Sequence, residues 1–182
     1  MDKKALRQAY KQKRKQLSAD QIIAIETSIL EQLQAINFDT ALYFHVFLPI
    51  KKQLEINTYP IIDYLKRLDK KIIISRSNFD DFSLEHFIYD NNTQIALNAY
   101  GIPEPVTGTP IAVNKIDVVL VPLLISDREN YRVGYGKGFY DRFLADCRQD
   151  IQTIGINYFA PIDKITDRDA YDIALDRVIY PK

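Results

Sequence analysis

The 182-residue chain predicts a single α/β domain in which helices cover both faces of a mostly parallel sheet, giving three layers. The first observation behind this prediction is that apolar, strand-like runs alternate with helical patterns along the chain. The second is that several runs, above all 115–125, are continuously apolar, as in strands buried on both faces. The third is that no repeat, low-complexity tract or linker divides residues 1–182. One core of ordinary size is therefore expected.

Residues 1–17 predict a basic first helix. Its apolar residues recur every three to four positions and form one stripe that would be buried: Leu6, Ala9, Tyr10 and Leu17. Basic side chains cover the rest of its surface: Lys3, Lys4, Arg7, Lys11, Lys13, Arg14 and Lys15.

A second helix is predicted to begin after Ser18. Gln21 stands three residues later, which is the spacing of a capping box. The positions that follow put four apolar residues on one face: Ile22, Ile25, Ile29 and Leu33. Two helices therefore precede the first strand.

Strands and further helices follow in alternation. Runs of aliphatic and aromatic residues predict strands at 41–48, 70–75, 82–89, 115–125, 153–158 and 174–180. The alternating pattern of 82–89 is typical of an edge strand. Thr58 predicts a capped helix start with Pro60 in the first turn. Residues 101–105, GIPEP, predict a stiff turn, and a last helix is expected from Phe139 through Leu144.

The composition disfavours several classes of function. The 24 basic residues balance 24 acidic ones, so net charge gives no reason to expect a nucleic acid or an anionic membrane as partner. No apolar run approaches the roughly 20 residues that span a bilayer, and the first residues lack the apolar core of a secretory signal. The single cysteine, Cys147, excludes an internal disulfide and fits a reducing cytoplasm. Its spacing from Phe143 and Leu144 favours a packed side chain over a catalytic thiol.

The stretch NYRVGYGKGFYDRFL carries the strongest chemical signal. Half of the six glycines in the chain alternate here: Gly134, Gly136 and Gly138. They follow the most apolar predicted strand and precede a predicted helix. This arrangement binds anions, because glycines admit a ligand close to the backbone and the amides of the helix N-terminus point at it. Arg132 and Lys137 add positive charge. From the pattern alone, a structural turn remains the alternative.

This stretch differs from two common phosphate loops. A Walker loop has Ser or Thr after its lysine, whereas Gly138 follows Lys137 here. The dinucleotide fingerprint has a different glycine spacing and follows an early strand. Asp141 comes next and has two interpretations: a charge that favours the helix N-terminus, or a carboxylate that holds Mg²⁺ beside phosphate oxygens.

The longer segment VPLLISDRENYRVGYGKGFYDRFL resembles the signature of the 5-formyltetrahydrofolate cyclo-ligase family, whose members are also called methenyltetrahydrofolate synthetases. The matching positions are Pro122, Asp127, Arg132, Gly134, Gly136, Gly138, Tyr140 and Asp141. Val133, Asn130 and Leu123 depart from residues that are common in the family, but none of these changes removes a charged group.

The resemblance extends over nearly the whole chain. Its other matching positions are Lys3, Lys4, Leu6 and Arg7 in the first helix, Glu55 in FLPIKKQLEINT, the GIPEP turn, and Asp176 and Val178 near the end. Tyr171 stands where the family often has histidine, so the match is less close in that region.

The resemblance implies an enzyme that uses ATP and Mg²⁺ to close 5-formyltetrahydrofolate into 5,10-methenyltetrahydrofolate, with release of ADP and phosphate. ATP would phosphorylate the formyl oxygen, and nitrogen 10 of the folate would then attack the activated carbon. Lys137 and Arg132 are the expected catalytic residues, because cations stabilise the charge of a transferring phosphoryl group. Asp141 and Asp176 are the expected Mg²⁺ ligands. We expect a cytoplasmic monomer with small-molecule substrates, and neither a nucleic acid nor a membrane as partner.

The resemblance also implies two sets of contact residues. The ATP-binding residues would be Lys3, Lys4, Arg7, Arg132, Val133, Gly134, Tyr135, Gly136, Lys137, Gly138, Phe139 and Tyr140. The folate-binding residues would be Phe47, Leu48, Glu55, Tyr135, Gly136, Lys137, Gly138 and Phe139, with Glu55 at the polar edge of the pterin. The fold would resemble the sugar-phosphate isomerase and CoA-transferase type.

Other residues are expected to have no role in the reaction. They are His45 and His86, expected to be structural, and Lys11, Arg14 and Lys15, expected at the surface; Arg76 stays open between a ligand contact and a surface position. The rival function is a non-catalytic domain that senses a phosphorylated metabolite, and such a sensor needs no pair of carboxylates on a cation. Nucleic-acid binding through the basic helix is disfavoured by the balanced charge.

Overall fold

The computed structural model describes residues 1–182. Its helices are α1 (Lys3–Lys15), α2 (Ala19–Gln34), α3 (Tyr59–Arg67) and α4 (Phe139–Asp146), with the short 3-10 helices η1 (Lys51–Gln53) and η2 (Val113–Lys115). Its strands are β1 (Tyr43–His45), β2 (Lys71–Ser77), β3 (Leu84–Ile88), β4 (Ile95–Leu97), β5 (Pro103–Pro105), β6 (Thr109–Pro110), β7 (Val118–Pro122), β8 (Ile125–Ser126), β9 (Arg132–Val133), β10 (Gln152–Ile156) and β11 (Arg177–Ile179). None of the helices is both long and apolar enough to cross a membrane.

Seven strands form one sheet in the order β11-β10-β7-β1-β2-β3-β6. Neighbours from β11 through β2 are parallel, whereas β3 and β6 are antiparallel additions at one edge. The predicted mostly parallel sheet is therefore confirmed. The segment predicted as an edge strand, 82–89, contains β3, which has only the two-residue β6 outside it.

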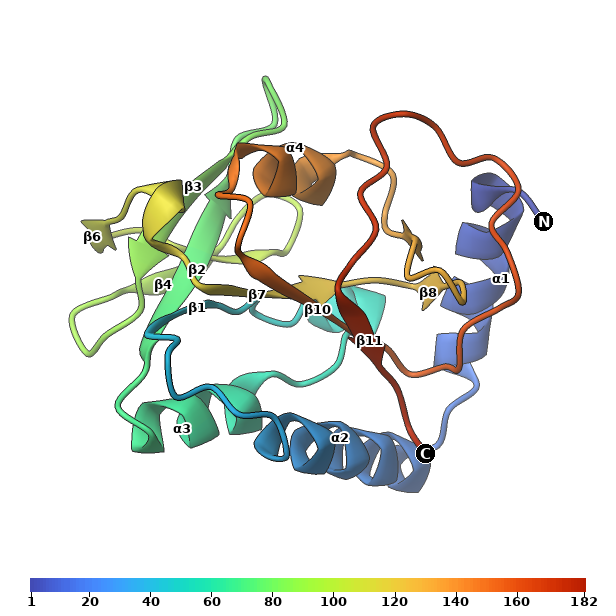
Figure 1. The fold of residues 1–182 in the computed structure, drawn as a ribbon, viewed down its shortest axis with the longest axis horizontal. Helices are drawn as coiled ribbons and strands as arrows, with labels where there is room; N and C mark the ends of the chain where they lie inside the picture. Colours follow the sequence, from blue (N-terminus) through green and yellow to red (C-terminus); the bar gives the residue numbers. More distant parts are fainter.

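The central strands are buried on both faces, which explains their continuously apolar sequences. On β7, Val118 and Leu120 pack into the cluster under α2 and α3, while Val119 and Val121 pack into the cluster under α4. Figure 1 shows α2 and α3 on one side of the sheet and α4 on the other. The predicted single α/β domain with three layers is confirmed. The likeness to the sugar-phosphate isomerase and CoA-transferase type stays a prediction.

Helix α1 lies beside the sheet, against the small hairpin of β8 and β9 (Figure 1). Leu6 and Tyr10 from the predicted apolar stripe of this helix pack with Ile125 and Val133 in a separate cluster. This packing holds the basic residues of α1 close to the segment that leads from β9 into α4.

The side-chain caps predicted at the starts of two helices, at Ser18 and Thr58, differ in the structure: one forms and the other does not. At Ser18 the side chain accepts the Gln21 N–H at 3.2 Å and the Gln21 side chain accepts the Ser18 N–H at 2.8 Å, so the capping box is confirmed. Thr58 does precede α3, with Pro60 in the first turn, but its side chain does not cap the helix. Its hydroxyl instead donates to the Phe47 carbonyl oxygen at 2.6 Å, tying the segment after β1 to α3.

Two short hairpins escaped prediction. Residues 103–105 of the expected GIPEP turn form β5, which pairs with β4, and two-residue strands form the hairpin of β8 and β9. Such short strands are too brief to show a repeating pattern in sequence. Strand β1 is also shorter than the predicted 41–48, because the chain leaves the sheet after Val46 donates to Ile73.

The direction of chain progression reverses between β1 and β7. From β1 the chain continues to β2 and β3 on one side, and from β7 it continues to β10 and β11 on the other. In open α/β sheets, ligands bind beyond the carboxyl ends of the strands at such a reversal. Phe47 and Leu48 after β1, Ser77 at the end of β2 and Pro122 at the end of β7 all line one cavity there.

Candidate functional site

A cavity of about 440 Å³ opens at the carboxyl ends of the central strands. Its walls come from α1, the loop after β1, the end of β2, the 100–103 segment and the glycine-rich loop before α4. The volume suits a small-molecule ligand.

The glycine-rich loop needs two of its glycines for clear steric reasons. Gly136 has φ +91°, and a Cβ there would lie 3.1 Å from the guanidinium carbon of Arg7. Gly138 has φ +74° and is the N-cap of α4, where a Cβ would lie 2.6 Å from an Arg142 nitrogen. Side chains rarely adopt this left-handed conformation. The loop therefore passes closely under Arg7 and ends at a helix N-terminus.

Cationic side chains surround this loop, and five of them line the cavity: Lys3, Arg7, Lys11, Arg132 and Lys137. Arg7 donates through Nε to the Gly134 carbonyl oxygen at 3.0 Å, which joins α1 to the loop. Arg132 donates to the Ile173 carbonyl oxygen at 2.8 Å. These residues form a positive end of the cavity that fits an anion.

Two carboxylates lie among these cations. Asp141 pairs with Arg132 at 2.6 Å, and Asp172 pairs with Lys3. Burial lowers the pKa of Arg132, while the negative charges of Asp141 and Asp172 oppose this shift. Both carboxylates line the cavity. Asp172 is a site residue that the sequence did not single out.

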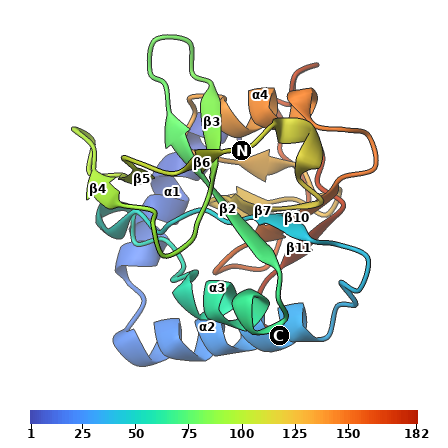
Figure 2. The same cartoon turned by 90° about the vertical axis from the view of Figure 1, so that its left-hand side faces the viewer.

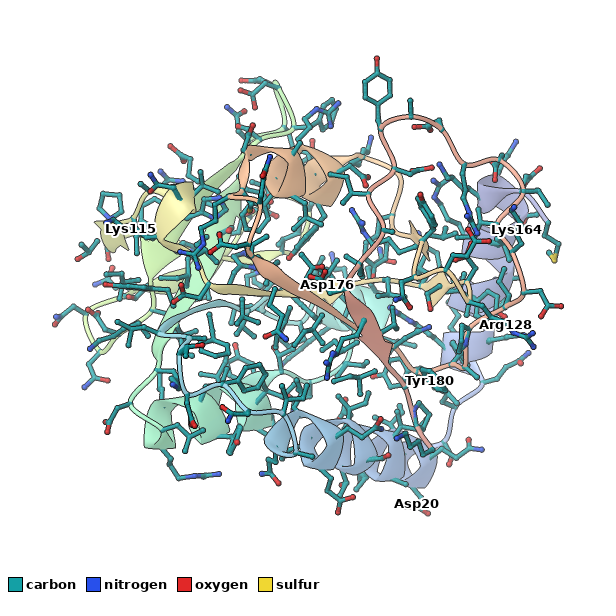
Figure 3. All side chains as sticks on the ribbon, viewed as in Figure 1. Asp20, Lys115, Arg128, Lys164, Asp176 and Tyr180 are labelled. Atoms are coloured by element: carbon teal, nitrogen blue, oxygen red, sulfur yellow. The ribbon has the colours of Figure 1, made fainter.

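The predicted convergence of Asp141 and Asp176 is not found. Asp176, labelled in Figure 3, immediately precedes β11. Its Oδ2 accepts from the backbone N–H and the hydroxyl of Thr153 at 2.7 and 2.8 Å. Thr153 is near the start of β10, so Asp176 lies at the amino-terminal edge of the parallel strands. The cavity lies at their opposite, carboxyl-terminal edge, and its lining includes Asp172 but not Asp176.

Glu55 forms a second polar feature of the cavity. Its Oε2 accepts the Ile50 N–H at 2.7 Å. Burial raises the pKa of Glu55, while that N–H, the hydroxyl of Tyr135 and the charge of Arg14 lower it. The Tyr135 hydroxyl in turn accepts from Arg14 at 3.0 Å. Glu55 is thus a carboxylate held in a fixed position, with capacity left for a ligand N–H.

Arg14 differs from its predicted surface position. Its side chain is only 3% exposed and donates to the Leu123 carbonyl oxygen as well as to Tyr135. Lys11, also expected at the surface, lines the cavity with its Nζ 5.3 Å from the centre of the Tyr135 ring. Lys15 is exposed as expected. The apolar stripe of α1 does not predict the positions of Lys11 and Arg14, because their contact residues, Leu123 and Tyr135, lie far away in sequence.

Apolar and aromatic side chains complete the walls. Phe47 and Leu48 are buried and line the same cavity as Glu55. At the mouth, Phe79 and Tyr100 stack with ring centres 4.2 Å apart, and Phe139 meets Phe79 edge-on at 5.2 Å. Phe79 lies in the turn between β2 and β3 that projects from the sheet in Figure 2. Sequence alone did not connect Phe79 and Tyr100 with the site.

Most of the predicted site residues line this one cavity: Lys3, Arg7, Phe47, Leu48, Glu55, Arg132, Gly134, Tyr135, Gly136, Lys137, Gly138, Phe139, Tyr140 and Asp141. Three do not: Lys4 is exposed, Val133 is buried in the cluster with α1, and Asp176 is bonded to Thr153. Lys4 and Val133 are sequence neighbours of the lining residues Lys3 and Arg132. Successive side chains point in different directions along a helix or a strand, so these two side chains do not face the cavity.

Arg76, which the sequence left open, and Cys147, which it predicted to be packed, both have structural surroundings. Arg76 pairs with Glu85 at 2.8 Å across β2 and β3 and does not line the cavity. Cys147 packs against the cluster under α4, and burial raises the pKa of its thiol to about 11. A thiol with a raised pKa is a poor nucleophile at neutral pH.

Comparison with known proteins decides the family. The sequence model of the 5-formyltetrahydrofolate cyclo-ligase family matches residues 1–181. The chain belongs to this family. A 5-formyltetrahydrofolate cyclo-ligase of Mycoplasma genitalium is 30% identical over 181 residues, covering 98% of each chain. The mouse protein of the same name is 25% identical, covering 98% of this chain and 93% of its own.

Solved structures agree with the family assignment. A 5,10-methenyltetrahydrofolate synthetase from Mycoplasma pneumoniae superposes with a TM-score of 0.75 and 25% identity, covering all of both chains. The NMR structure of an Aquifex aeolicus protein of the same name has a TM-score of 0.81 at 24% identity, covering all of this chain and 93% of the other. As a member of the cyclo-ligase family, the chain is an enzyme of the ligase class.

Proposed function

We propose that this cyclo-ligase closes 5-formyltetrahydrofolate to 5,10-methenyltetrahydrofolate at the expense of ATP, with Mg²⁺, through a phosphorylated formyl group. One observation carries the proposal. A single cavity joins a cation-rich glycine loop at a helix N-terminus to an apolar wall that carries the partly buried carboxylate of Glu55. This combination suits a triphosphate at one end and a flat, N–H-bearing ring at the other.

The triphosphate end consists of the loop amides and the surrounding cations. Arg7 and Arg132 are held by backbone carbonyl oxygens, whereas Lys137 has only an aromatic contact, its Nζ lying 5.7 Å from the Phe82 ring centre. Lys137 is thus able to follow the phosphoryl group during transfer. A cation so placed stabilises the transition state more than the ground state.

Mg²⁺ fits the carboxylates on this side of the cavity. No three or more His, Cys, Asp or Glu side chains are grouped so that they could hold a metal ion by themselves, but Mg²⁺ beside phosphates needs only one or two carboxylates. Asp141 and Asp172 supply them, and Asp172 replaces Asp176 in this role because it shares the cavity. When bound, the ion would neutralise charge on the phosphate oxygens.

The folate end would hold the pterin between Phe47, Leu48 and Phe139, with Glu55 accepting its N–H groups. An amide-type oxygen is a poor leaving group, and phosphorylation turns it into phosphate. Nitrogen 10 then bonds to the formyl carbon, phosphate departs with the oxygen, and nitrogen 10 loses its proton. The residues contribute by holding the two substrates side by side.

The decisive experiment mixes the purified protein with ATP, Mg²⁺ and 5-formyltetrahydrofolate. The absorbance of the methenyl product should rise, ADP should appear in equal amount, and omission of any one component should abolish both signals. Folded protein that binds both substrates without turnover would instead support the metabolite sensor. A cytoplasmic location and a monomeric state stay predictions of the sequence.

A further inference from the structure

Asp127 is a fully buried acidic residue that has no place in the proposed chemistry. It is one of the matching positions of the family signature, yet it does not line the cavity. Its carboxylate accepts four hydrogen bonds. Oδ1 accepts the N–H groups of Glu129 and Tyr131 at 3.1 and 3.0 Å. Oδ2 accepts the Ile165 N–H at 3.0 Å and an N–H of the Arg168 guanidinium. A buried charge is costly without such partners, so its retention calls for a role.

The four bonds join two segments that lie far apart in the sequence. Oδ1 holds the turn of the hairpin between β8 and β9. Oδ2 holds the connection between β10 and β11, residues 157–176. A parallel backbone bridge between Asp127 and Ile162 joins the same two segments. Figure 1 shows the connection running beside α1. Asp127 therefore fixes the path of the connection past the hairpin.

Arg168 completes this junction from the side of the connection. Its guanidinium donates to Asp127 through one nitrogen and to Glu129 through another, and its central carbon lies 4.1 Å from the centre of the Tyr131 ring. Only a planar guanidinium can serve two carboxylates and an aromatic face together. A buried ion pair adds little net stability compared with apolar side chains of similar size. Its contribution here is a fixed geometry.

The residues on both sides of Arg168 hold a cation of the cavity. Asp167 Oδ1 accepts the backbone N–H of Lys3 at 2.8 Å, and Asp169 pairs with Lys3 Nζ at 3.3 Å. Asp172, further along the same connection, also pairs with this Nζ. Lys3 lines the cavity. The position of Lys3 therefore depends on the path of the connection, which the junction at Arg168 fixes.

We propose that Asp127 and Arg168 are positioning residues that hold Lys3 in place to bind a triphosphate. This inference rests on the proposed function, because it takes the cation-rich end of the cavity as the triphosphate site. Neither residue lines the cavity, so their effect on the nucleotide passes through the connection and Lys3. Loss of the junction should weaken binding of the nucleotide and spare binding of the folate.

The first test measures two ligands on full-length Arg168→Gln by calorimetry. The dissociation constant of a non-hydrolysable ATP analogue with Mg²⁺ should rise about three- to tenfold, because Lys3 loses its fixed position. That of 5-formyltetrahydrofolate should stay within about twofold of the wild type. Equal weakening of the two ligands would indicate a general loss of structure and overturn the inference.

Arg128→Gln is the matched control. Arg128, labelled in Figure 3, pairs with Asp163 at 3.0 Å between the same two segments, but both side chains are largely exposed. An exposed pair of this kind contributes little. Both dissociation constants should therefore stay at their wild-type values in this variant. A loss of nucleotide affinity as large as that in Arg168→Gln would contradict a specific role of the buried junction.

The second test asks whether Arg168 acts through Lys3. Lys3→Met should by itself weaken the ATP analogue about tenfold, because one charge-assisted contact is lost. Adding Arg168→Gln to Lys3→Met should then weaken the analogue by less than about a further twofold, since the group to be positioned is absent. Effects of the two changes that multiply in full would show that Arg168 does not act through Lys3.

The outcomes separate this inference from the function beneath it. Wild-type protein that binds no ATP analogue would refute the proposed function. Wild-type protein that binds the analogue no more tightly than folded Arg168→Gln would refute only the positioning role. If Arg168→Gln does not fold, Arg168→Lys decides, because it keeps the charge beside Asp127 and loses the planar guanidinium. It should weaken the analogue alone, and unchanged affinity would overturn the inference.

Discussion

Lys137 is the cation in the glycine loop with the fewest contacts in the protein. Its Nζ lies over the Phe82 ring, and no carboxylate pairs with it. A side chain with so few contacts contributes little to stability. Its removal should therefore lower catalysis and leave the fold unchanged.

We therefore expect Lys137→Ala to lower kcat/KM for cyclisation by about 100-fold or more, as for other cations on transferring groups. The melting temperature should stay near that of the wild type. Lys115→Ala, at an exposed lysine outside the cavity, is the matched control and should keep full activity. Wild-type turnover in the Lys137 variant would remove this residue from the mechanism.

Arg14 shows how a single residue can depart from a helical pattern. On sequence it belongs to the basic face of α1, but its guanidinium passes over the apolar stripe and bonds to Leu123 and Tyr135. Long cationic side chains often bury their stem in this way. The partners come from the segment after β7 and from the glycine loop, so only the packed fold could reveal them.

Replacing Arg14 by methionine should lower the free energy of unfolding by about 2–4 kcal/mol, because the buried Leu123 carbonyl oxygen, the Tyr135 hydroxyl and the Gln53 carbonyl oxygen lose their donor. Urea titration followed by circular dichroism measures the change. Lys15→Ala, one residue along and exposed, should stay within about 0.5 kcal/mol of the wild type. Comparable losses in the two variants would mean that Arg14 contributes through charge on the helix and not through its buried contacts.

At the scale of elements, α4 and β3 together create a pH-sensitive contact. Helix α4 covers His86 through Phe143, and burial lowers the pKa of His86 from 6.5 to about 4. The unfolded chain therefore binds a proton between these values that the folded protein does not bind. The stability due to neutral His86 is complete above pH 6.5 and is lost as the pH falls toward 4.

The free energy of unfolding should thus decrease below pH 6.5 with a slope of up to about 1.4 kcal/mol per pH unit from this group. His86→Asn removes the titrating ring and retains a partner for Ser75, whose Oγ lies 2.8 Å from His86 Nδ1. The wild type should lose about 2 kcal/mol more than this variant between pH 6.5 and 4, as measured by denaturant titration at each pH. If the free energy of unfolding changed with pH in the same way in the wild type and in His86→Asn, His86 would be solvated in the folded protein.

Local elements were predictable where the sequence holds a complete local signal. The capping box at Ser18 and Gln21 formed because both partners lie within one helical turn. The hairpin of β8 and β9 was missed because two residues per strand give no period. The Thr58 hydroxyl bonds to the Phe47 carbonyl oxygen, a partner 11 positions away that no local pattern indicates, and it makes no cap bond to α3. In each case, the outcome depended on whether the hydrogen-bond partners lie within the same element or in a distant part of the chain.

At the scale of the whole molecule, the edges of the sheet separate two aspartates that lie four residues apart. Asp172 reaches the cavity at the carboxyl ends of the strands, and Asp176 bonds to Thr153 near the opposite ends. Parallel strands place all their carboxyl ends on one edge, so the sites at the two edges are distinct.

We expect Asp172→Asn to raise the Mg²⁺ concentration required for half-maximal cyclisation by several-fold, because one of two carboxylates for the ion is lost. Asp176→Asn should leave this requirement unchanged and lower the free energy of unfolding by about 1–3 kcal/mol through the lost bonds to Thr153. Magnesium titrations and urea titrations of both variants check this. A raised Mg²⁺ requirement in the Asp176 variant alone would restore Asp176 as the ligand.

The sequence by itself determined the α/β class, the parallel sheet and the glycine loop with Arg132, Lys137 and Asp141, because each depends on contiguous residues with a clear period or spacing. Only the tertiary structure decided that Asp172 and not Asp176 shares the cavity, that Arg14 is buried, and that His45, Ser75 and His86 are connected. The physical reason is that these properties depend on which strand ends and helix faces meet. These partners lie from 11 to 121 positions apart and carry no local signal of that meeting.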